Sequence, residues 1–221
     1  MTPRAAGSMH TFETPRPAEG RLTEWLLRGF ATAVMAFVVA RWGQAWLIDP
    51  SRWTALLLLI SEGYTLILVL VARRATRRDM TLSSMLVTLY ASCFVVLLEP
   101  LGTNGIVSES TGAALQLLGI AWQLAAKACL GRSFGLLPAQ RGLVTAGPYR
   151  IVRHPIYFGY LLSHVGFLLT NLSWRNAAVL AFLYAAQVVR IRREEAVLVA
   201  TDSSYQSYQR RVRWRLLPFV Y

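Results

Sequence analysis

Apolar segments of about twenty residues recur along the whole chain, separated by short arginine-rich connections. A helix needs about 20 apolar residues to cross the ~30 Å hydrocarbon core of a bilayer. Only 15% of the residues are charged, against about 25% in a typical soluble domain. The sequence therefore predicts an all-α, polytopic membrane helical bundle of about six transmembrane helices. The six segments cover approximately residues 24–48, 53–72, 81–99, 111–130, 155–172 and 175–191.

The distribution of polar residues divides the chain into three regions. Residues 1–22 contain prolines and glycines without apolar periodicity, which predicts a disordered cytoplasmic tail. Residues 23–130 hold the N-terminal transmembrane helices. Residues 131–221 combine the longest connection, the last two apolar segments and a polar C-terminal tail, and we expect a cofactor-binding catalytic region there.

The basic residues indicate how the helices are oriented. Of the 23 Lys and Arg, eighteen fall on one side of the predicted membrane, whereas the opposite connections hold Arg52 and Arg175. Because basic residues are enriched in cytoplasmic loops, both termini are expected in the cytoplasm, at a bacterial inner membrane. The same scattered placement argues against a nucleic-acid partner, despite the net charge of +12.

The stretch "GPYRIVRHPIYFGY", residues 147–160, places basic residues directly before an apolar segment. Pro155 suits the first position of a helix, which puts His154 near the N-cap. Backbone N–H groups at such a position attract anions, and Arg153 adds a bidentate donor for carboxylate or phosphate. Membrane topology or contact with lipid head groups would account equally well for Arg150 and Arg153.

The predicted helix that follows has one face of polar side chains and one face of small residues. Tyr157, Tyr160 and His164 share one face, and His164 is expected to be a hydrogen-bonded interior residue. A stripe of small residues on the same helix is suited to close helix contact in lipid; it consists of Gly159, Ser163 and Gly166.

Two adjacent carboxylates, Glu194 and Glu195, follow the sixth segment. Neighbouring helical residues point about 100° apart, so the two do not share one proton. They would either pair with nearby arginines or contact different parts of one ligand. Together with Arg153 and His154 they would offer a cation to a carboxylate and an anion to an ammonium group. That pattern matches the amino-acid end of S-adenosylmethionine, and it also matches other zwitterions.

Metal and nucleotide-loop motifs are not found in the sequence. The two cysteines share no short spacing with each other or with a histidine, and no glycine-rich phosphate loop is present. No metal site is therefore expected.

The C-terminal part of the chain resembles membrane methyltransferases related to isoprenylcysteine carboxyl methyltransferase and phospholipid N-methyltransferases. The resemblance covers roughly residues 127–221 and rests on "LGRSFG", "LVTAGPYRIVRHPIYFGYLL", "RIRREEAVL" and "YQSYQRRVRWRLLPFV". In one departure, the chain has Thr201-Asp202 where family members often have Phe-Gly.

The resemblance implies an S-adenosylmethionine-dependent methyltransferase that acts on an apolar or lipid-like acceptor with a carboxylate, amine or thiol. It implies catalytic roles for Arg153, His154 and Tyr157, and closure of the site by Tyr205 and Tyr208. The implied cofactor-binding residues are Leu143, Val144, Gly147, Tyr149, Arg153, His154, Pro155, Tyr157, Gly159, Glu194 and Glu195.

Two other functions remain open from the sequence. A membrane reductase of the sterol-reductase type would share a similar C-terminal architecture and bind NADPH instead. A non-enzymatic membrane accessory protein would retain the motif without the activity. Cofactor binding distinguishes the three.

Overall fold

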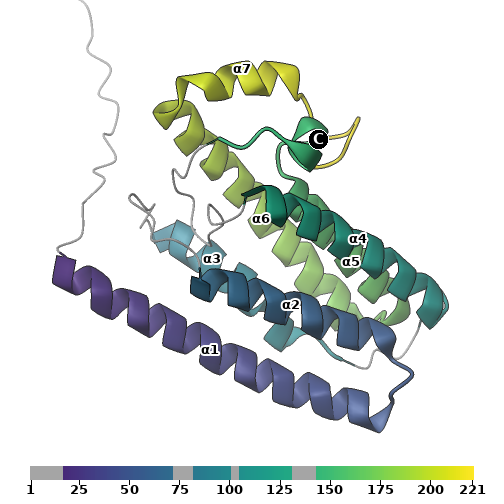
Figure 1. Cartoon of the computed structure of the whole chain (residues 1–221). Coiled ribbons are helices and arrows are strands. Elements are labelled where there is room, and N and C mark those ends of the chain that lie inside the picture. The colour runs from purple at the N-terminus through teal and green to yellow at the C-terminus, as the bar shows by residue number, and fades with distance from the viewer. Residues whose placement is uncertain (1–16, 72–81, 101–104, 131–142) are drawn as a thin grey trace, which may run out of the picture.

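The computed structural model describes residues 17–71, 82–100, 105–130 and 143–221, in which the regular elements are helices joined by turns and irregular segments (Figure 1). The all-α prediction is confirmed for these residues, and each of the six apolar segments forms most of one long helix. The first helix begins seven residues earlier than the apolar segment. The elements are α1 (Pro17–Ile48), α2 (Trp53–Val71), α3 (Leu82–Leu97), α4 (Glu109–Leu130), the 3-10 helix η2 (Gly147–Arg150), α5 (Pro155–Thr170), α6 (Trp174–Thr201) and α7 (Ser203–Arg211).

Successive long helices run in opposite directions, so that the start of α5 and the ends of α2, α4 and α6 lie at one end of the bundle (Figure 1). The helix α7 lies at this end, which we call the α7 end. The α7 end carries the stretch with Arg150 and Arg153 and also the C-terminal segment, whereas Arg52 and Arg175 lie at the opposite end. This separation agrees with the charge asymmetry from which the orientation was predicted.

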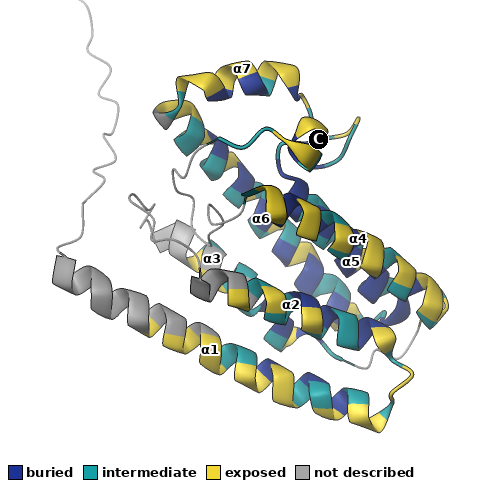
Figure 2. Ribbon diagram, in the orientation of Figure 1, coloured by how far each residue is buried: buried dark blue, intermediate teal, exposed yellow. Residues whose placement is uncertain are grey.

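Among the described helices, α4 meets the length and apolarity that a membrane crossing requires. Residues 32–48 of α1 and the helix α5 are also apolar, over shorter lengths. Large apolar side chains are exposed on the outer faces, among them Leu47, Phe37 and Phe182, and exposed positions run along α1 and α4 (Figure 2). Extensive apolar exposure is typical of a surface covered by lipid or by another protein. The six crossings stay a prediction.

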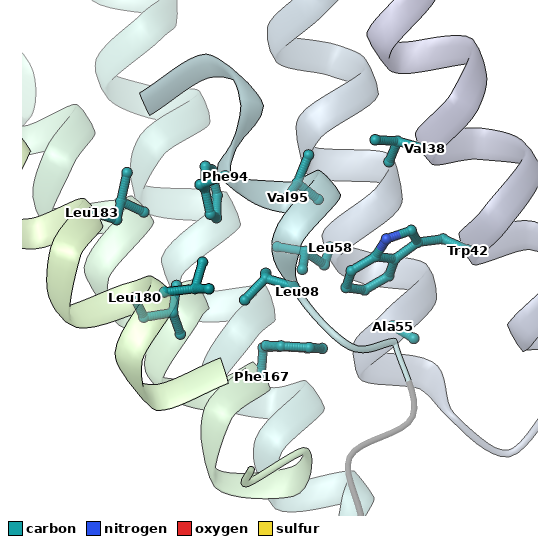
Figure 3. Packing of buried hydrophobic residues seen from close by; sticks show 11 residues of the cluster. Val38, Trp42, Ala55, Leu58, Phe94, Val95, Leu98, Phe167, Leu180 and Leu183 are labelled. Atoms are coloured by element: carbon teal, nitrogen blue, oxygen red, sulfur yellow. The ribbon is translucent and has the colours of Figure 1, made fainter. Parts of the chain in front are cut away.

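A compact apolar core joins α1, α2, α3, α5 and α6 in the half of the bundle away from α7. Figure 3 shows Trp42 of α1 beside Leu58 of α2 and above Phe167 of α5. The rings of Trp42 and Phe167 are 5.5 Å apart between centroids, and both side chains are almost fully buried. Each buried side chain of this size contributes about 1.5–3 kcal/mol, so this core anchors α5 and α6 to the N-terminal helices.

The helices α4 and α5 approach each other closely through glycines. A Cβ added to Gly159 would lie 2.7 Å from the carbonyl oxygen of Gly119, and one added to Gly119 would lie 2.5 Å from the amide nitrogen of Ser163. Gly166 faces the carbonyl oxygen of Gly112 in the same way, at 2.6 Å. The predicted stripe of small residues is therefore confirmed as a helix contact, and its partner is α4.

Polar side chains tie the helices together at the end away from α7. The backbone N–H of Thr54 donates to Glu109 Oε1 at 2.7 Å, and Asn171 Nδ2 donates to Thr54 Oγ1 at 3.0 Å. Asn176 Nδ2 in turn donates to the carbonyl of Asn171 at 2.8 Å. Thr54, Asn171 and Asn176 are fully buried and Glu109 is partly buried, and all four are paired, so they hold α2, α4, α5 and α6 in register.

Candidate active site

Glu195 forms the centre of a buried ionic cluster at the α7 end. Arg153 Nε donates to its Oε1 at 2.7 Å, and His154 Nε2 lies 3.3 Å from the same oxygen. Arg215 Nε donates to Oε2 at 2.9 Å. Arg153 and His154, which are neighbours in the sequence, thus meet a glutamate about forty residues later. They can do so because α6 continues well past its apolar stretch. We call Arg153, His154, Glu195 and Arg215 the Glu195 cluster.

Glu194 points to a different partner. Tyr157 Oη donates to Glu194 Oε2 at 3.2 Å, and the Tyr157 ring stacks on the His154 ring with 5.8 Å between centroids. The two glutamates therefore serve two separate sets of side chains, in agreement with the prediction that they do not share a proton. Of the two alternatives for Glu195, ion pairing is the one seen in this structure.

The C-terminal segment, residues 212–221, closes over this cluster as a strap. The backbone N–H groups of Arg153 and His154 donate to the carbonyls of Trp214 and Arg215, each at 2.8 Å. Arg153 Nη1 also donates to the carbonyls of Val212 and Arg213, at 2.9 and 3.0 Å. His154 occupies the N-cap position of α5 and Pro155 follows it, as predicted. Arg153 is consequently committed to holding the strap as well as Glu195.

Glu195 remains ionised over a wide pH range. Burial opposes its charge, but hydrogen bonds from His154 and Arg215, with the charge of His154 and a further bond from Arg153, outweigh burial and lower the pKa to about 2. An ordinary glutamate has a pKa of about 4.3. The cluster is therefore intact at neutral pH.

The Glu195 cluster should make stability sensitive to acid. Because the folded pKa of Glu195 is lowered, its stabilisation is complete above the unfolded pKa and is lost as the pH falls from about 4.5 to about 2. A lowering of this size corresponds to roughly 3 kcal/mol. We expect the melting temperature of the purified protein in detergent to fall over that window, and Glu195→Gln to flatten the profile. An equally steep profile for Glu195→Gln would contradict the assignment.

An aromatic layer packs against the Glu195 cluster. Tyr205 and Tyr208 of α7 are buried with Val212, and Tyr208 Oη donates to the carbonyl of Tyr149 at 2.8 Å. Burial raises the pKa of Tyr208 to about 12 and also raises that of Tyr149. Both phenols are therefore neutral at neutral pH. Leu143 packs on the apolar cluster that contains the α7 aromatics, and Val144 packs on the one that contains Tyr149. The five predicted residues therefore lie in two clusters that the hydrogen bond from Tyr208 to Tyr149 joins.

Two predicted glycines have clear structural roles. Gly147 has φ +59°, a conformation that L side chains rarely adopt, and a Cβ there would meet Cys129 Sγ at 2.7 Å. This glycine therefore allows the chain to turn into η2 against the end of α4. Gly159, also predicted to bind the cofactor, lies in the contact with α4.

The capping of α7 accounts for the departure at Thr201-Asp202. Asp202 is the N-cap of α7, and its carboxylate accepts a hydrogen bond from the backbone N–H of Ser204 at 2.9 Å. The same residue ends α6. Asp202 thus fixes the corner that directs Tyr205 and Tyr208 over the site. The first part of the predicted loop, residues 131–142, lies outside the described residues.

Lys127 marks a second polar region deeper in the bundle, which the sequence interpretation missed. Its Nζ donates to Thr65 Oγ1 at 3.0 Å and to Gln123 Oε1 at 2.8 Å, and it lies 4.8 Å from the centre of the Tyr160 ring. The ammonium group is thereby buried between α2, α4 and α5. A charged residue within an apolar segment was the available signal, because such residues usually face an interior site.

His164 belongs to the same region. Its Nδ1 lies 2.7 Å from Tyr184 Oη, its Nε2 lies 3.9 Å from Glu62 Oε1, and its ring stacks on Tyr160. The expectation that His164 is a hydrogen-bonded interior residue is confirmed at Nδ1. We call the whole set the inner polar cluster; it comprises Glu62, Thr65, Gln123, Lys127, Tyr160, His164 and Tyr184.

Comparison with known proteins identifies the region that carries most residues of both clusters. Residues 107–204 match the family of phospholipid methyltransferases. The match extends from the start of α4 into α7, so it includes Arg153, His154, Tyr157, Glu194 and Glu195 and ends before the strap. The resemblance predicted for roughly residues 127–221 is confirmed over residues 127–204, and the match extends it toward the N-terminus to residue 107. No curated protein matches the chain.

The family match indicates a membrane methyltransferase. It covers α5 and α6, which position Arg153, His154 and Glu195. It also covers α4, α5 and α6, three of the four helices that line the inner polar cluster. The N-terminal helices α1 to α3 lie outside the match.

Proposed function

We propose that this protein is an S-adenosylmethionine-dependent methyltransferase of the bacterial inner membrane, with its active site facing the cytoplasm at the α7 end. The observation that carries the proposal is the convergence of Arg153, His154, Tyr157, Glu194 and Glu195 at the start of α5, within the region of the family match. The six helical segments with exposed apolar side chains support a membrane location.

The residues at this end fit the amino-acid part of the cofactor. Glu194 accepts one hydrogen bond from Tyr157, and a carboxylate can accept about four, so it retains capacity for an ammonium group. Arg153 uses its Nε and Nη1 groups within the protein, which leaves the Nη2 donors for a carboxylate. In this arrangement Glu195 orients Arg153 and His154, and Glu194 contacts the ligand.

Methyl transfer from this cofactor requires little acid–base chemistry, because the sulfonium supplies an already activated methyl group. The protein must align the acceptor with the methyl group and exclude water. Tyr205, Tyr208 and the strap would close the cytoplasmic side. An apolar acceptor would enter between helices from the lipid, with its carboxylate, amine or thiol directed toward the inner polar cluster. The family match supports this function over the NADPH-dependent reductase and the accessory protein.

Binding of S-adenosylhomocysteine to the purified protein in detergent tests the proposal. We expect Glu194→Gln and His154→Ala to weaken the binding about 10- to 100-fold, the range for loss of a hydrogen bond to a charged group. Isothermal titration calorimetry gives the dissociation constants. Glu99→Gln is a matched control, because Glu99 is a partly exposed carboxylate that pairs with Arg175 at the opposite end. Binding of NADPH without binding of S-adenosylhomocysteine would overturn the proposal.

A further inference from the structure

A groove of about 310 Å³ lies on the outer side of the strap, between the strap and η2. None of the four residues of the Glu195 cluster lines it, so it is separate from the candidate active site. In Figure 1 the yellow C-terminal segment runs beside η2, which directly precedes α5. The groove is lined by Arg150, Ile151, Arg211, Val212, Arg213, Trp214, Pro218 and Phe219.

Three of the lining residues are exposed arginines, Arg150, Arg211 and Arg213. Among the described residues no carboxylate forms an ion pair with them, whereas Arg153 and Arg215 both pair with Glu195. Three guanidinium groups around one depression create a strong positive potential there. The planar fork of donors on each arginine matches the oxygen atoms of a phosphate group.

The rim of the groove is apolar and exposed. Phe219 is 84% exposed, Val220 is 75% exposed and Ile151 is 49% exposed. Phe219 has φ 67°, a backbone region that residues other than glycine seldom occupy, and its ring lies 5.4 Å from that of Trp214. The strap therefore holds an aromatic side chain exposed on the surface, at a cost in backbone strain, directly beside the arginines.

We propose that this groove binds the head group of an anionic phospholipid, with Arg150, Arg211 and Arg213 around the phosphate and the Phe219–Val220 pair in the adjoining apolar region of the bilayer. A soluble phosphate compound would use the arginines but would leave the apolar rim exposed. Aromatic and basic side chains side by side are typical of a surface at the lipid–water boundary. The groove lies outside the candidate active site, but five of its lining residues belong to the strap that covers that site, so a bound lipid would contact the strap directly.

Titration of the delipidated, full-length protein in detergent with short-chain phosphatidylglycerol tests the proposal. We expect phosphatidylglycerol to bind at least ~10-fold more tightly than phosphatidylcholine of the same chain length. The double variant Arg211→Gln/Arg213→Gln should weaken phosphatidylglycerol binding about 30-fold, because each basic residue contributes roughly fivefold at a lipid surface. The matched control, Arg192→Gln/Arg210→Gln, removes two exposed arginines that do not line the groove. It should change the affinity for phosphatidylglycerol less than about twofold.

A second variant separates lipid binding from phosphate binding. Phe219→Gly removes the exposed ring and suits the positive φ, so the strap should remain folded while phosphatidylglycerol binding weakens. Glycerol phosphate should compete poorly. Equal affinity for the two lipids, an unchanged affinity of both variants, or glycerol phosphate binding as tight as that of the lipid would each overturn the proposal. S-adenosylhomocysteine binding by the unsubstituted protein, measured in the same detergent without added lipid, tests the proposed function separately, so a failure here is distinct from a failure of the proposed function.

Discussion

Replacing Glu195 with alanine should lower the free energy of unfolding by about 3–5 kcal/mol and abolish S-adenosylhomocysteine binding. The substitution leaves the buried guanidinium of Arg153 without its counter-charge and removes the partner of Arg215. Breaking one member of a buried ion pair is far more costly than losing an exposed pair, because the remaining charge stays desolvated. The strap would keep its hydrogen bonds to Arg153 and His154 but would lose the ion pair between Arg215 and Glu195.

Thermal or chemical unfolding in detergent, combined with calorimetric titration of S-adenosylhomocysteine, checks this expectation. Glu99→Ala is the matched control, since its pair with Arg175 is exposed and 3.8 Å long; it should cost less than about 1 kcal/mol and leave ligand binding intact. If Glu195→Ala were as stable as the control, the cluster would not hold the strap. If it were unstable but still bound the ligand tightly, the strap would not be part of the site.

Replacing Gly159 with alanine should destabilise the protein by about 2–3 kcal/mol, the range for overpacking a close contact. The added Cβ would lie 2.7 Å from Gln123 Cβ and from the carbonyl oxygen of Gly119. The carbonyl belongs to the backbone of α4, so the clash is relieved only when the helices separate. Because α5 carries His154 and Tyr157 at its start, that separation should also weaken S-adenosylhomocysteine binding.

Two further alanine variants distinguish helix packing from direct ligand contact. Gly119→Ala makes the reciprocal clash from α4, at 2.5 Å from the amide nitrogen of Ser163, and should be at least as destabilising. Gly43→Ala is the control, since a Cβ there meets nothing within 4 Å, and a helical Gly-to-Ala change should be neutral or stabilising by up to about 1 kcal/mol. Loss of ligand binding in Gly159→Ala with unchanged stability would assign Gly159 to the cofactor instead.

The sequence predicted the helices well because their signal is local. Each apolar segment is long enough to form a helix by itself, and α2 and α4 end within one residue of their predicted limits. Pro155 predicted the start of α5 for an equally local reason, since the missing N–H has no partner at that position. The prediction was weaker beyond the apolar stretches, where α6 continues to Thr201 and η2 and α7 form in polar sequence.

The partners of the charged residues were harder to predict. Glu194 and Glu195 were identified as a candidate pair, but seven arginines in the C-terminal part compete for them by composition alone. Only the path of the strap selects Arg215. The pairing of Glu62 with His164 likewise depends on α2 and α5 lying side by side, and their separation of about a hundred residues gives no local signal.

The sequence by itself determined the all-helical architecture, the six long segments, the resemblance to membrane methyltransferases and the residues from which a site at the start of α5 is built. These follow from hydropathy, proline placement and a short motif, all of which act over a few helical turns. The tertiary structure decided that Glu195 neutralises Arg153 while Glu194 faces Tyr157, that Gly159 serves the contact with α4, and that the strap separates the candidate active site from the arginine-lined groove. The reason is physical: which buried charge meets which depends on the packing of segments far apart in the chain, and no local pattern specifies that packing.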